Sequence, residues 1–175
     1  MITTNVDGLF KKSGFAAERV FEVQGDYALM QCAVACHDGL YFNGDLVRQM
    51  TEATHDCRIP SHLVPHCPKC GGQMELHIRK DGYFIEDEAW NEALARYSTF
   101  CDRARGGRTL LIELGVGFNT PTIIRFPFER MASANGDVTL VRMNSGCADR
   151  VMDIERFVPF TEGIGGVLAD AACAL

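Results

Sequence analysis

The stretch that decides the fold is TLLIELGVGFNTP, residues 109–121. A short apolar run bounded by glycines predicts a buried strand over Thr109 to Leu114. Thr120 is a plausible N-cap, and the proline after it suits the first position of a helix. We therefore expect a buried strand that turns directly into a helix from Thr122 to about Ala132, which Pro127 kinks or shortens.

The chain after this stretch continues the same alternation. VTLVRM (138–143) and the segment Phe157 to Phe160 predict two more strands. A loop is expected at Gly163 to Gly166, followed by a short helix over Val167 to Ala172. The order of strand, helix, strand, loop, strand and helix is typical of a doubly wound parallel sheet in an α/β protein.

The chain before this stretch is less regular. Residues 86–104 form the clearest predicted helix, because acidic residues occupy its first turn and apolar residues repeat at steps of three and four. RVFEV (19–23) alternates like a strand, and Ile2 reads as the end of another, with a turn over Thr3 to Gly8. Residues 26–80 show little periodicity, which predicts a source of order other than an apolar core.

Two cysteine pairs supply that source of order. Cys32 and Cys36 form C-x3-C, and Cys67 and Cys70 form C-x2-C followed by two glycines. Four thiolates on two tight turns complete a tetrahedron around Zn²⁺, so the spacing predicts a structural zinc site. The nearby Cys57, His37, His55, His62 and His66 are interpreted as bystanders, with the substitution of one of them for a thiolate as the alternative.

Composition narrows the class of protein. A chain of 175 residues with 47% hydrophobic residues is long enough for one domain with a sizeable insertion. The net charge of -6 argues against a nucleic-acid partner. We see neither an apolar run long enough for a membrane span nor a secretory signal, so we expect a cytoplasmic protein with reduced thiols.

The motifs taken in order resemble those of one known family. TTNVDGLFKKSGF, VFEVQGDY, the two cysteine pairs, LLIELGVGFNTP and TLVRMN together resemble the sirtuin (Sir2) family of NAD-dependent protein-modifying enzymes. The resemblance implies a partial doubly wound Rossmann-like parallel sheet over residues 1–27 and 81–175, with a small zinc-binding module inserted at 28–80. It implies NAD as cosubstrate and structural Zn²⁺. The cofactor-binding residues that it implies are Thr4, Asn5, Asp7, Gln24, Gly115, Gly117 and Asn144.

The departures from the sirtuin pattern suggest a particular branch. Gln24 stands where sirtuins have the catalytic His, and Thr4 stands where they have Gln. Gly115-Val116-Gly117 replaces the G-T-S turn, and the V-V-x-F-G-E stretch is not recognisable in HIRKDGYFIEDEAW. This set resembles the macrodomain-linked class M sirtuins. The resemblance implies protein ADP-ribosylation, a lipoylated carrier protein as substrate and a macrodomain hydrolase as functional neighbour.

Side-chain chemistry bears on the choice between two reactions. Deacylation requires a base at neutral pH, which histidine provides and Gln24 does not. Glutamine still orients a hydroxyl or a nucleophile through hydrogen bonds. The candidate catalytic set is therefore Gln24, Asn5 and Asp7 for ADP-ribosyl transfer. A protein-lysine deacylase and a noncatalytic zinc-containing scaffold are the alternatives.

Two further expectations concern what surrounds these motifs. Compared with the sirtuin pattern, these 175 residues lack the first strand of the nucleotide-binding sheet and its G-A-G-x-S loop. We therefore expect a fragment or a short form. We also expect weak or absent NAD binding by these residues alone. Arg79 and Arg142 are interpreted as solvated charges, with contact to an anionic carrier surface as the alternative.

Overall fold

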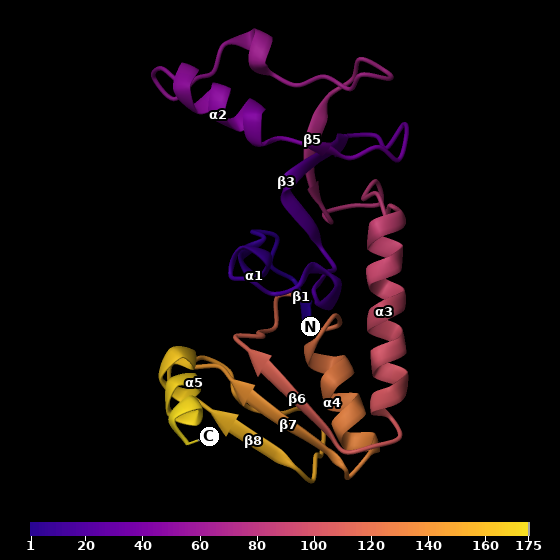
Figure 1. The fold of residues 1–175 in the computed structure, drawn as a ribbon, viewed down its shortest axis with the longest axis vertical. Helices are drawn as coiled ribbons and strands as arrows, with labels where there is room; N and C mark the ends of the chain where they lie inside the picture. Colours follow the sequence, from indigo (N-terminus) through magenta and orange to yellow (C-terminus); the bar gives the residue numbers. More distant parts are fainter. Residues whose placement is uncertain (175) are drawn as a thin grey trace. The chain divides into compact units, whose positions relative to one another are not determined.

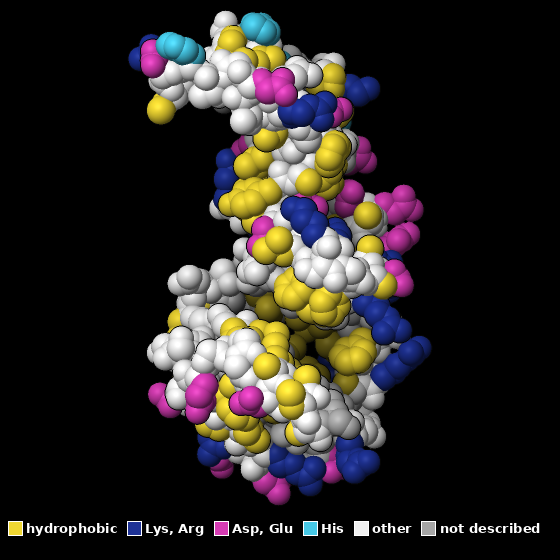
Figure 2. Space-filling model, turned by 60° about the vertical axis from the view of Figure 1, so that its left-hand side comes forward, with side chains coloured by type: hydrophobic (Ala, Val, Ile, Leu, Met, Phe, Trp, Pro, Cys, Tyr) yellow, Lys and Arg dark blue, Asp and Glu magenta, His cyan; other side chains and the backbone are white. Residues whose placement is uncertain are grey.

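A computed structural model describes residues 1–174 of the chain. These residues form two compact units, Met1–Tyr97 and Ser98–Leu175 (Figure 1). No helix in the described range is long and apolar enough to span a membrane. On the face shown in Figure 2, acidic and basic side chains are intermixed, with hydrophobic side chains between them.

The unit Ser98–Leu175 is built on a parallel sheet. Its strands are β6 (Thr109–Leu114), β7 (Val138–Met143) and β8 (Phe157–Phe160), in the order β6-β7-β8 (Figure 1). The register places Leu111 opposite Leu140 and Leu140 opposite Phe157. The three strands and their α/β arrangement confirm the predicted alternation. The prediction that β6 is buried throughout is wrong, because Leu110, Ile112 and Leu114 are exposed on one face of the strand.

The two helices of this unit begin at other residues than expected. Helix α4 spans Arg125–Ala134, after a turn at 121–124, so the prediction that Thr120 caps it is wrong. Pro127 lies in the first turn of α4, where its missing N–H breaks no intrahelical bond. Helix α5 spans Ile164–Cys173, so its first turn takes up most of the loop predicted after Gly163. The loop is predicted because Gly165 and Gly166 have low helix propensity, but propensity decides little at the end of a helix.

The apolar core of this unit lies between the sheet and α4. Helix α4 packs against β7. The buried core residues are Leu111, Ala132, Val138, Leu140 and Ile154, and partly buried Phe128, Met131, Met152 and Phe157 pack around them. Burial of this apolar surface provides the main stabilisation of the unit.

The unit Met1–Tyr97 begins with two very short parallel strands. Strand β1 (Ile2–Thr3) pairs with β2 (Phe21–Glu22), and between them lie α1 (Leu9–Lys12) and a 3-10 turn at Ala17–Arg19. The strand predicted over residues 19–23 is therefore shorter than expected. Its parallel pairing with β1 places the two following loops at the same edge.

Residues 26–80 contain more regular structure than their sequence indicates. Strand β3 (Gly25–Cys32) pairs antiparallel with β4 (Tyr41–Phe42) and with β5 (Met74–Ile78), and Figure 1 shows β3 and β5 side by side. Helix α2 spans Gly44–Ala53, and a 3-10 turn spans Ser61–Leu63. A register shift between Asp26 and Met30 interrupts the alternation of β3, which explains why the pattern of a strand is hard to detect.

Helix α3 spans Glu88–Ala104, close to its predicted range. Asp87 accepts a hydrogen bond from the Trp90 N–H at 2.9 Å, so the carboxylate caps the helix and sets its start. Within the unit Met1–Tyr97, the rings of Trp90 and Tyr97 pack against Phe21, with centroid distances of 5.3 and 5.9 Å.

Candidate functional site

The loops after β1 and β2 carry the candidate catalytic residues. Because β1 and β2 are parallel neighbours, the residues that follow them lie at one edge. The Val23 N–H donates to the Thr3 carbonyl at 3.2 Å, and the Tyr27 N–H donates to the Val6 carbonyl at 2.8 Å. The structure thus brings the loop that contains Thr4, Asn5 and Asp7 alongside the segment that contains Gln24.

These polar side chains differ in how far they are engaged. The Asp7 carboxylate accepts the Leu9 N–H at 3.0 Å, in the turn that leads into the short helix α1. Asn5 is exposed and Gln24 is half-buried, and neither side chain has a hydrogen-bond partner within residues 1–174. The amides of Asn5 and Gln24 are therefore available for a ligand, whereas one Asp7 oxygen already has a structural role.

Arg79 lies beside this edge and is not a freely solvated charge. Its backbone N–H donates to the Gln24 carbonyl at 3.0 Å. Its guanidinium lies 4.2 Å from the Phe84 ring centroid and pairs with Glu86 at 2.5 Å. The side chain is 35% exposed, so Arg79 is a partly solvated charge that is also packed on an aromatic ring and ion-paired.

A second set of predicted residues lies at the carboxyl ends of β6 and β7. Gly115 follows β6 with φ of +67°, a left-handed conformation that favours glycine. Asn144 follows β7, and its side-chain N–H donates to the Val116 carbonyl at 3.1 Å. Its side-chain oxygen accepts the N–H groups of Gly146 and Cys147 at 2.9 and 3.0 Å. Asn144 thereby joins the Gly115–Gly117 loop to its own.

Four fully buried charges lie beneath these two loops. Arg142 donates to both carboxylate oxygens of Glu113, at 2.6 and 3.1 Å, and pairs with Glu129 at 2.8 Å. The prediction of a solvated Arg142 is wrong, because its side chain is 0% exposed. Burial alone lowers the pKa of Arg142, but its bonds to Glu113 and Glu129 outweigh burial and raise that pKa.

Arg125 completes this network by binding backbone. Its guanidinium donates to the carbonyls of Val116 at 3.1 Å and Cys147 at 3.2 Å, and to that of Asp149. Glu129 in turn accepts the N–H groups of residues 151 and 152. The buried charges therefore fix both loops at this edge. Sequence reasoning missed Glu113, Arg125 and Glu129, although an Arg-to-Glu spacing of four on α4 was an available signal.

The cysteine pairs of residues 26–80 converge. The Cys32 and Cys70 sulfurs lie 3.7 Å apart, and those of Cys36 and Cys67 lie 3.6 Å apart. His37 Nδ1 lies 3.2 Å from the Cys36 sulfur and 3.8 Å from that of Cys67. The ligand atoms of Cys32, Cys36, His37 and Cys67 all lie within 4.8 Å of one another.

Local backbone geometry produces this convergence. Cys32 ends β3, and Ala35 adopts a positive φ of 45° in the turn that leads to Cys36. In the second turn, the Cys67 N–H donates to the Gly72 carbonyl at 2.7 Å, and Gly71 has φ of +72°. The glycine after Cys70 thus permits the tight turn that brings both sulfurs to one side.

The crowded sulfurs perturb one another. N–H groups of Cys36 and Val34 lower the pKa of the Cys32 thiol to about 6. Burial of the Cys36 sulfur among the other thiols raises its pKa to about 12, although the residue as a whole is exposed. Burial also raises the pKa of Cys67, but N–H groups of Cys70 and Lys69 outweigh it, and the net shift is downward. A cation with affinity for sulfur would bind the thiolate that is already stabilised and displace the proton of the thiol beside it.

The donor set fits Zn²⁺. With Zn–S bonds of about 2.3 Å, a tetrahedral site places sulfurs about 3.8 Å apart, which is close to the spacing of the two sulfur pairs. Among the described residues, this is the one group of three or more Cys, His, Asp or Glu ligand atoms at metal spacing. This group contains Cys32, Cys36, Cys67 and also His37, which is interpreted from sequence as a bystander. The predicted ligand Cys70 lies outside the group, although its sulfur is 3.7 Å from that of Cys32. Cys57, His55, His62 and His66 also lie outside it.

Comparisons with known proteins give the context of these features. No family model matches the chain. It is 35% identical over 173 residues to a protein ADP-ribosyltransferase of Staphylococcus aureus, covering 98% of this chain and 55% of that relative. It is 33% identical over 152 residues to a probable bifunctional ADP-ribose hydrolase/ADP-ribosyltransferase of Fusarium oxysporum, covering 82% of this chain and 25% of that relative. The chain therefore spans about half the length of the first relative and a quarter of the second.

Solved structures show a similar fold. A sirtuin solved in work on substrate affinity matches 99% of this chain with a TM-score of 0.61 and 17% identity, over 63% of its own length. A Sir2 protein bound to a propionylated peptide matches 99% of this chain with a TM-score of 0.62 and 17% identity, over 62% of its own length. At this level of identity the likeness concerns the fold.

Proposed function

The chain has the sirtuin fold and is related over nearly its whole length to a protein ADP-ribosyltransferase, and on this premise we propose that it is a sirtuin-like, NAD-dependent protein ADP-ribosyltransferase. The observation that carries the proposal is the 35% identity over 173 residues to the staphylococcal relative. Because the chain covers only 55% of that relative, we propose the relative's activity for this chain on the basis of the identity and do not take it as shown.

In this proposal the β1–β2 edge holds the reacting part of the cosubstrate. NAD, when bound, supplies an ADP-ribosyl group through cleavage of its nicotinamide–ribose bond. The Asn5 amide and the second oxygen of Asp7 orient the nicotinamide amide and the ribose, with Thr4 beside them. Gln24 orients the nucleophile by hydrogen bonding, because its amide does not take up a proton at neutral pH.

Within the unit Ser98–Leu175, the proposed cofactor-binding residues are Gly115, Gly117 and Asn144, at the edge of β6 and β7. Gly117 leaves its backbone N–H accessible to a phosphate oxygen, whereas the Gly115 N–H donates to the Met143 carbonyl at 2.9 Å. Asn144 binds a ribose hydroxyl. The network of Arg125, Arg142 and their two glutamates supports this assignment, because a loop held by buried charges is already in its binding geometry.

Structural zinc belongs to the same proposal. The proposed ligands are Cys32, Cys36, Cys67 and Cys70, with His37 either replacing one thiolate or donating a hydrogen bond to the Cys36 sulfur. Four protein ligands close the coordination sphere, so we assign the metal a folding role. The proposal places the chain in the cytoplasm, where the thiols that zinc needs stay reduced.

The proposed acceptor is a protein, and a lipoylated carrier protein in particular. Related solved structures hold peptides, which supports a protein acceptor. A macrodomain hydrolase is the proposed functional neighbour, since the Fusarium relative is named for both an ADP-ribose hydrolase and a transferase activity.

A deacylase is the second candidate, because a related Sir2 protein was solved with a propionylated peptide. It is weaker because Gln24 replaces the base that the reaction needs. A noncatalytic zinc-containing scaffold is the third.

One assay separates the three functions. The chain is incubated with millimolar labelled NAD and lipoylated carrier protein, and in parallel with an acyl-lysine peptide. Label on the carrier that is lost in Asn5→Ala and Gln24→Ala, and kept in the exposed α2 control Gln49→Ala, supports the transferase. Release of O-acyl-ADP-ribose identifies a deacylase. Bound zinc with neither product supports the scaffold and contradicts the proposal.

A further inference from the structure

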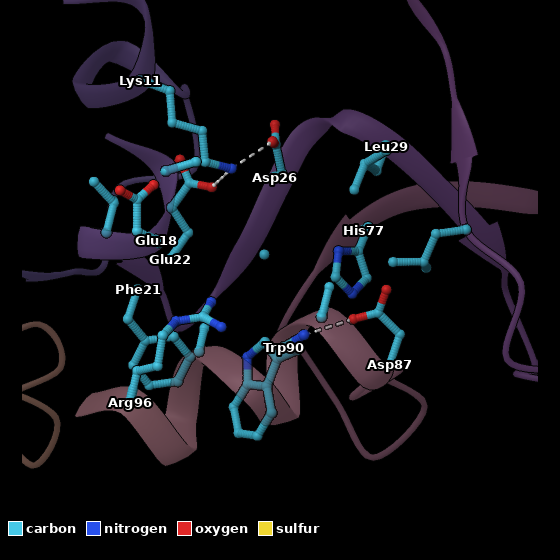
Figure 3. Close-up of a pocket in the computed structure, with 16 residues that line it drawn as sticks. Lys11, Glu18, Phe21, Glu22, Asp26, Leu29, His77, Asp87, Trp90 and Arg96 are labelled. Carbon is cyan, nitrogen blue, oxygen red and sulfur yellow. Dashed lines mark hydrogen bonds and ion pairs between the residues drawn. The ribbon is translucent and has the colours of Figure 1, made fainter. Parts of the chain in front are cut away.

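The unit Met1–Tyr97 contains a cavity of about 430 Å³ whose lining includes none of the candidate catalytic residues. Figure 3 shows side chains from α1, β2, β3, β5 and the first turns of α3 converging on it. Phe21 and Trp90 form an aromatic wall, with ring centroids 5.3 Å apart. A cavity of this size holds a small organic group.

His77 presents an unsatisfied acceptor to this cavity. The side chain is 3% exposed, stacks on Phe84 at 4.4 Å and faces the cavity in Figure 3. Its Nε2 lies 2.9 Å from the Ile85 carbonyl, which only accepts, so Nε2 carries the proton. In the neutral ring Nδ1 is then an acceptor, and this buried atom has no hydrogen-bond partner. A buried unpaired acceptor calls for a donor.

The charged groups of the cavity also favour a donor. Four carboxylates line it against two cations, Lys11 and Arg96. The carboxylates are those of Glu18, Glu22, Asp26 and Asp87. Lys11 contacts Glu22 and lies 3.8 Å from Asp26, and Asp87 caps α3. Glu18 has no ion pair within residues 1–174, so a negative charge at the rim is left over.

These acceptors do not form a metal site. The cavity's carboxylates and His77 are not among the ligand atoms that lie at metal spacing in residues 1–174. Separated acceptors beside aromatic rings suit a cationic group that has several N–H donors and is attached to an alkyl chain. We propose that this cavity binds an alkyl guanidinium or alkylammonium group, supplied either by an arginine or lysine side chain of a partner protein or by a free amine. The site is independent of the proposed transferase activity.

The test titrates the ¹⁵N-labelled chain with butylguanidinium, and with the neutral isostere butylurea as control. We expect saturable binding of butylguanidinium that is at least about tenfold tighter than that of butylurea, with a shift of the His77 Nδ1 resonance. A capped Gly-Arg-Gly peptide against its citrulline counterpart distinguishes the two sources: tighter binding of the arginine peptide than of butylguanidinium indicates a protein side chain, and the reverse indicates a free amine.

Two variants locate the site. Glu18→Gln removes the unpaired rim charge and is expected to weaken butylguanidinium binding about threefold or more, whereas Glu52→Gln on exposed α2 leaves it unchanged. His77→Phe keeps the stacking on Phe84 and is expected to weaken binding at least about tenfold. If His77→Phe does not fold, Glu18→Gln and the Nδ1 resonance still decide. Equal binding of butylurea, an unmoved Nδ1 resonance, or unchanged affinity in Glu18→Gln overturns the proposal.

Discussion

Residues 26–80 and the β6–β8 sheet are ordered in opposite ways. In the first region the residues with the lowest exposure include Cys32 and Cys67, together with the polar Gln31 and Asn43. In the second, apolar residues such as Leu140 fill a core between the sheet and α4. One region is held by a ligand cluster and backbone pairing, and the other by burial of apolar surface.

The comparison also shows where each region places its charges. The sulfurs of the first region lie close together around a position suited to a cation, so we expect a bound metal ion to stabilise them. The β6–β8 region buries two arginines and two glutamates that form ion pairs with one another. The first region therefore depends on what binds it, whereas the second carries its own counter-ions.

Metal removal is expected to produce the largest difference in stability between the two regions. A chelator should unfold residues 26–80 and leave the β6–β8 sheet folded, because structural zinc contributes about 10–16 kcal/mol in small zinc domains. Hydrogen exchange with mass spectrometry, with and without chelator, measures this. Zinc added back should restore protection, and unchanged protection of residues 26–80 would contradict the assignment.

Breaking the buried ion network should affect only the second region. Arg142→Met leaves Glu113 and Glu129 buried without their shared cation, and should lower the free energy of unfolding by about 3–5 kcal/mol. Chemical denaturation followed by exchange of the β6–β8 amides tests this. Arg130→Met, on an exposed position of α4, is the matched control. A loss as small as in the control would show that the network contributes little.

Ligand substitutions should sharpen the description of the first region. If four thiolates bind the metal, Cys70→Ser should weaken zinc binding by well over tenfold, and His37→Ala by about tenfold through its bond to the Cys36 sulfur. Competition with a metal indicator measures both. Cys57→Ser is the control, since Cys57 lies outside the cluster. The opposite ranking would make His37 the fourth ligand.

The smallest effect is expected at Asn144. Asn144→Ala removes one hydrogen bond to the Val116 loop and two within its own loop, which should cost about 1–3 kcal/mol of stability, and should speed exchange of the Gly146 and Cys147 amides. Asn119→Ala, in the exposed segment after Gly117, serves as control. Equal exchange in both variants would show that the loops are held by Arg125 alone.

The predictability of each region follows from the range of its interactions. Strands β6, β7 and β8 were predictable with their bounds because short runs rich in apolar and β-branched residues indicate strands locally. The burial of β6 was not, since the run TLLIEL does not show that every second residue is exposed. Strands β3 and β5 were not predictable, because each is stabilised by pairing with a strand more than forty residues away in the chain. Arg142 was misread as solvated, and the packing of Arg79 on Phe84 was missed, because the sequence does not show what packs against a charge.

By itself the sequence determined the α/β alternation, the spacing of the cysteine pairs and the polar residues that follow β1, β2, β6 and β7. These are properties of short stretches, in which residue type and period carry the information. Only the tertiary structure decided that Arg125 and Arg142 are buried under the loops, that His37 lies among the cysteine sulfurs and that His77 faces a cavity with an unpaired nitrogen. Those properties depend on which distant residues meet, because burial and hydrogen bonding are set by neighbours in space.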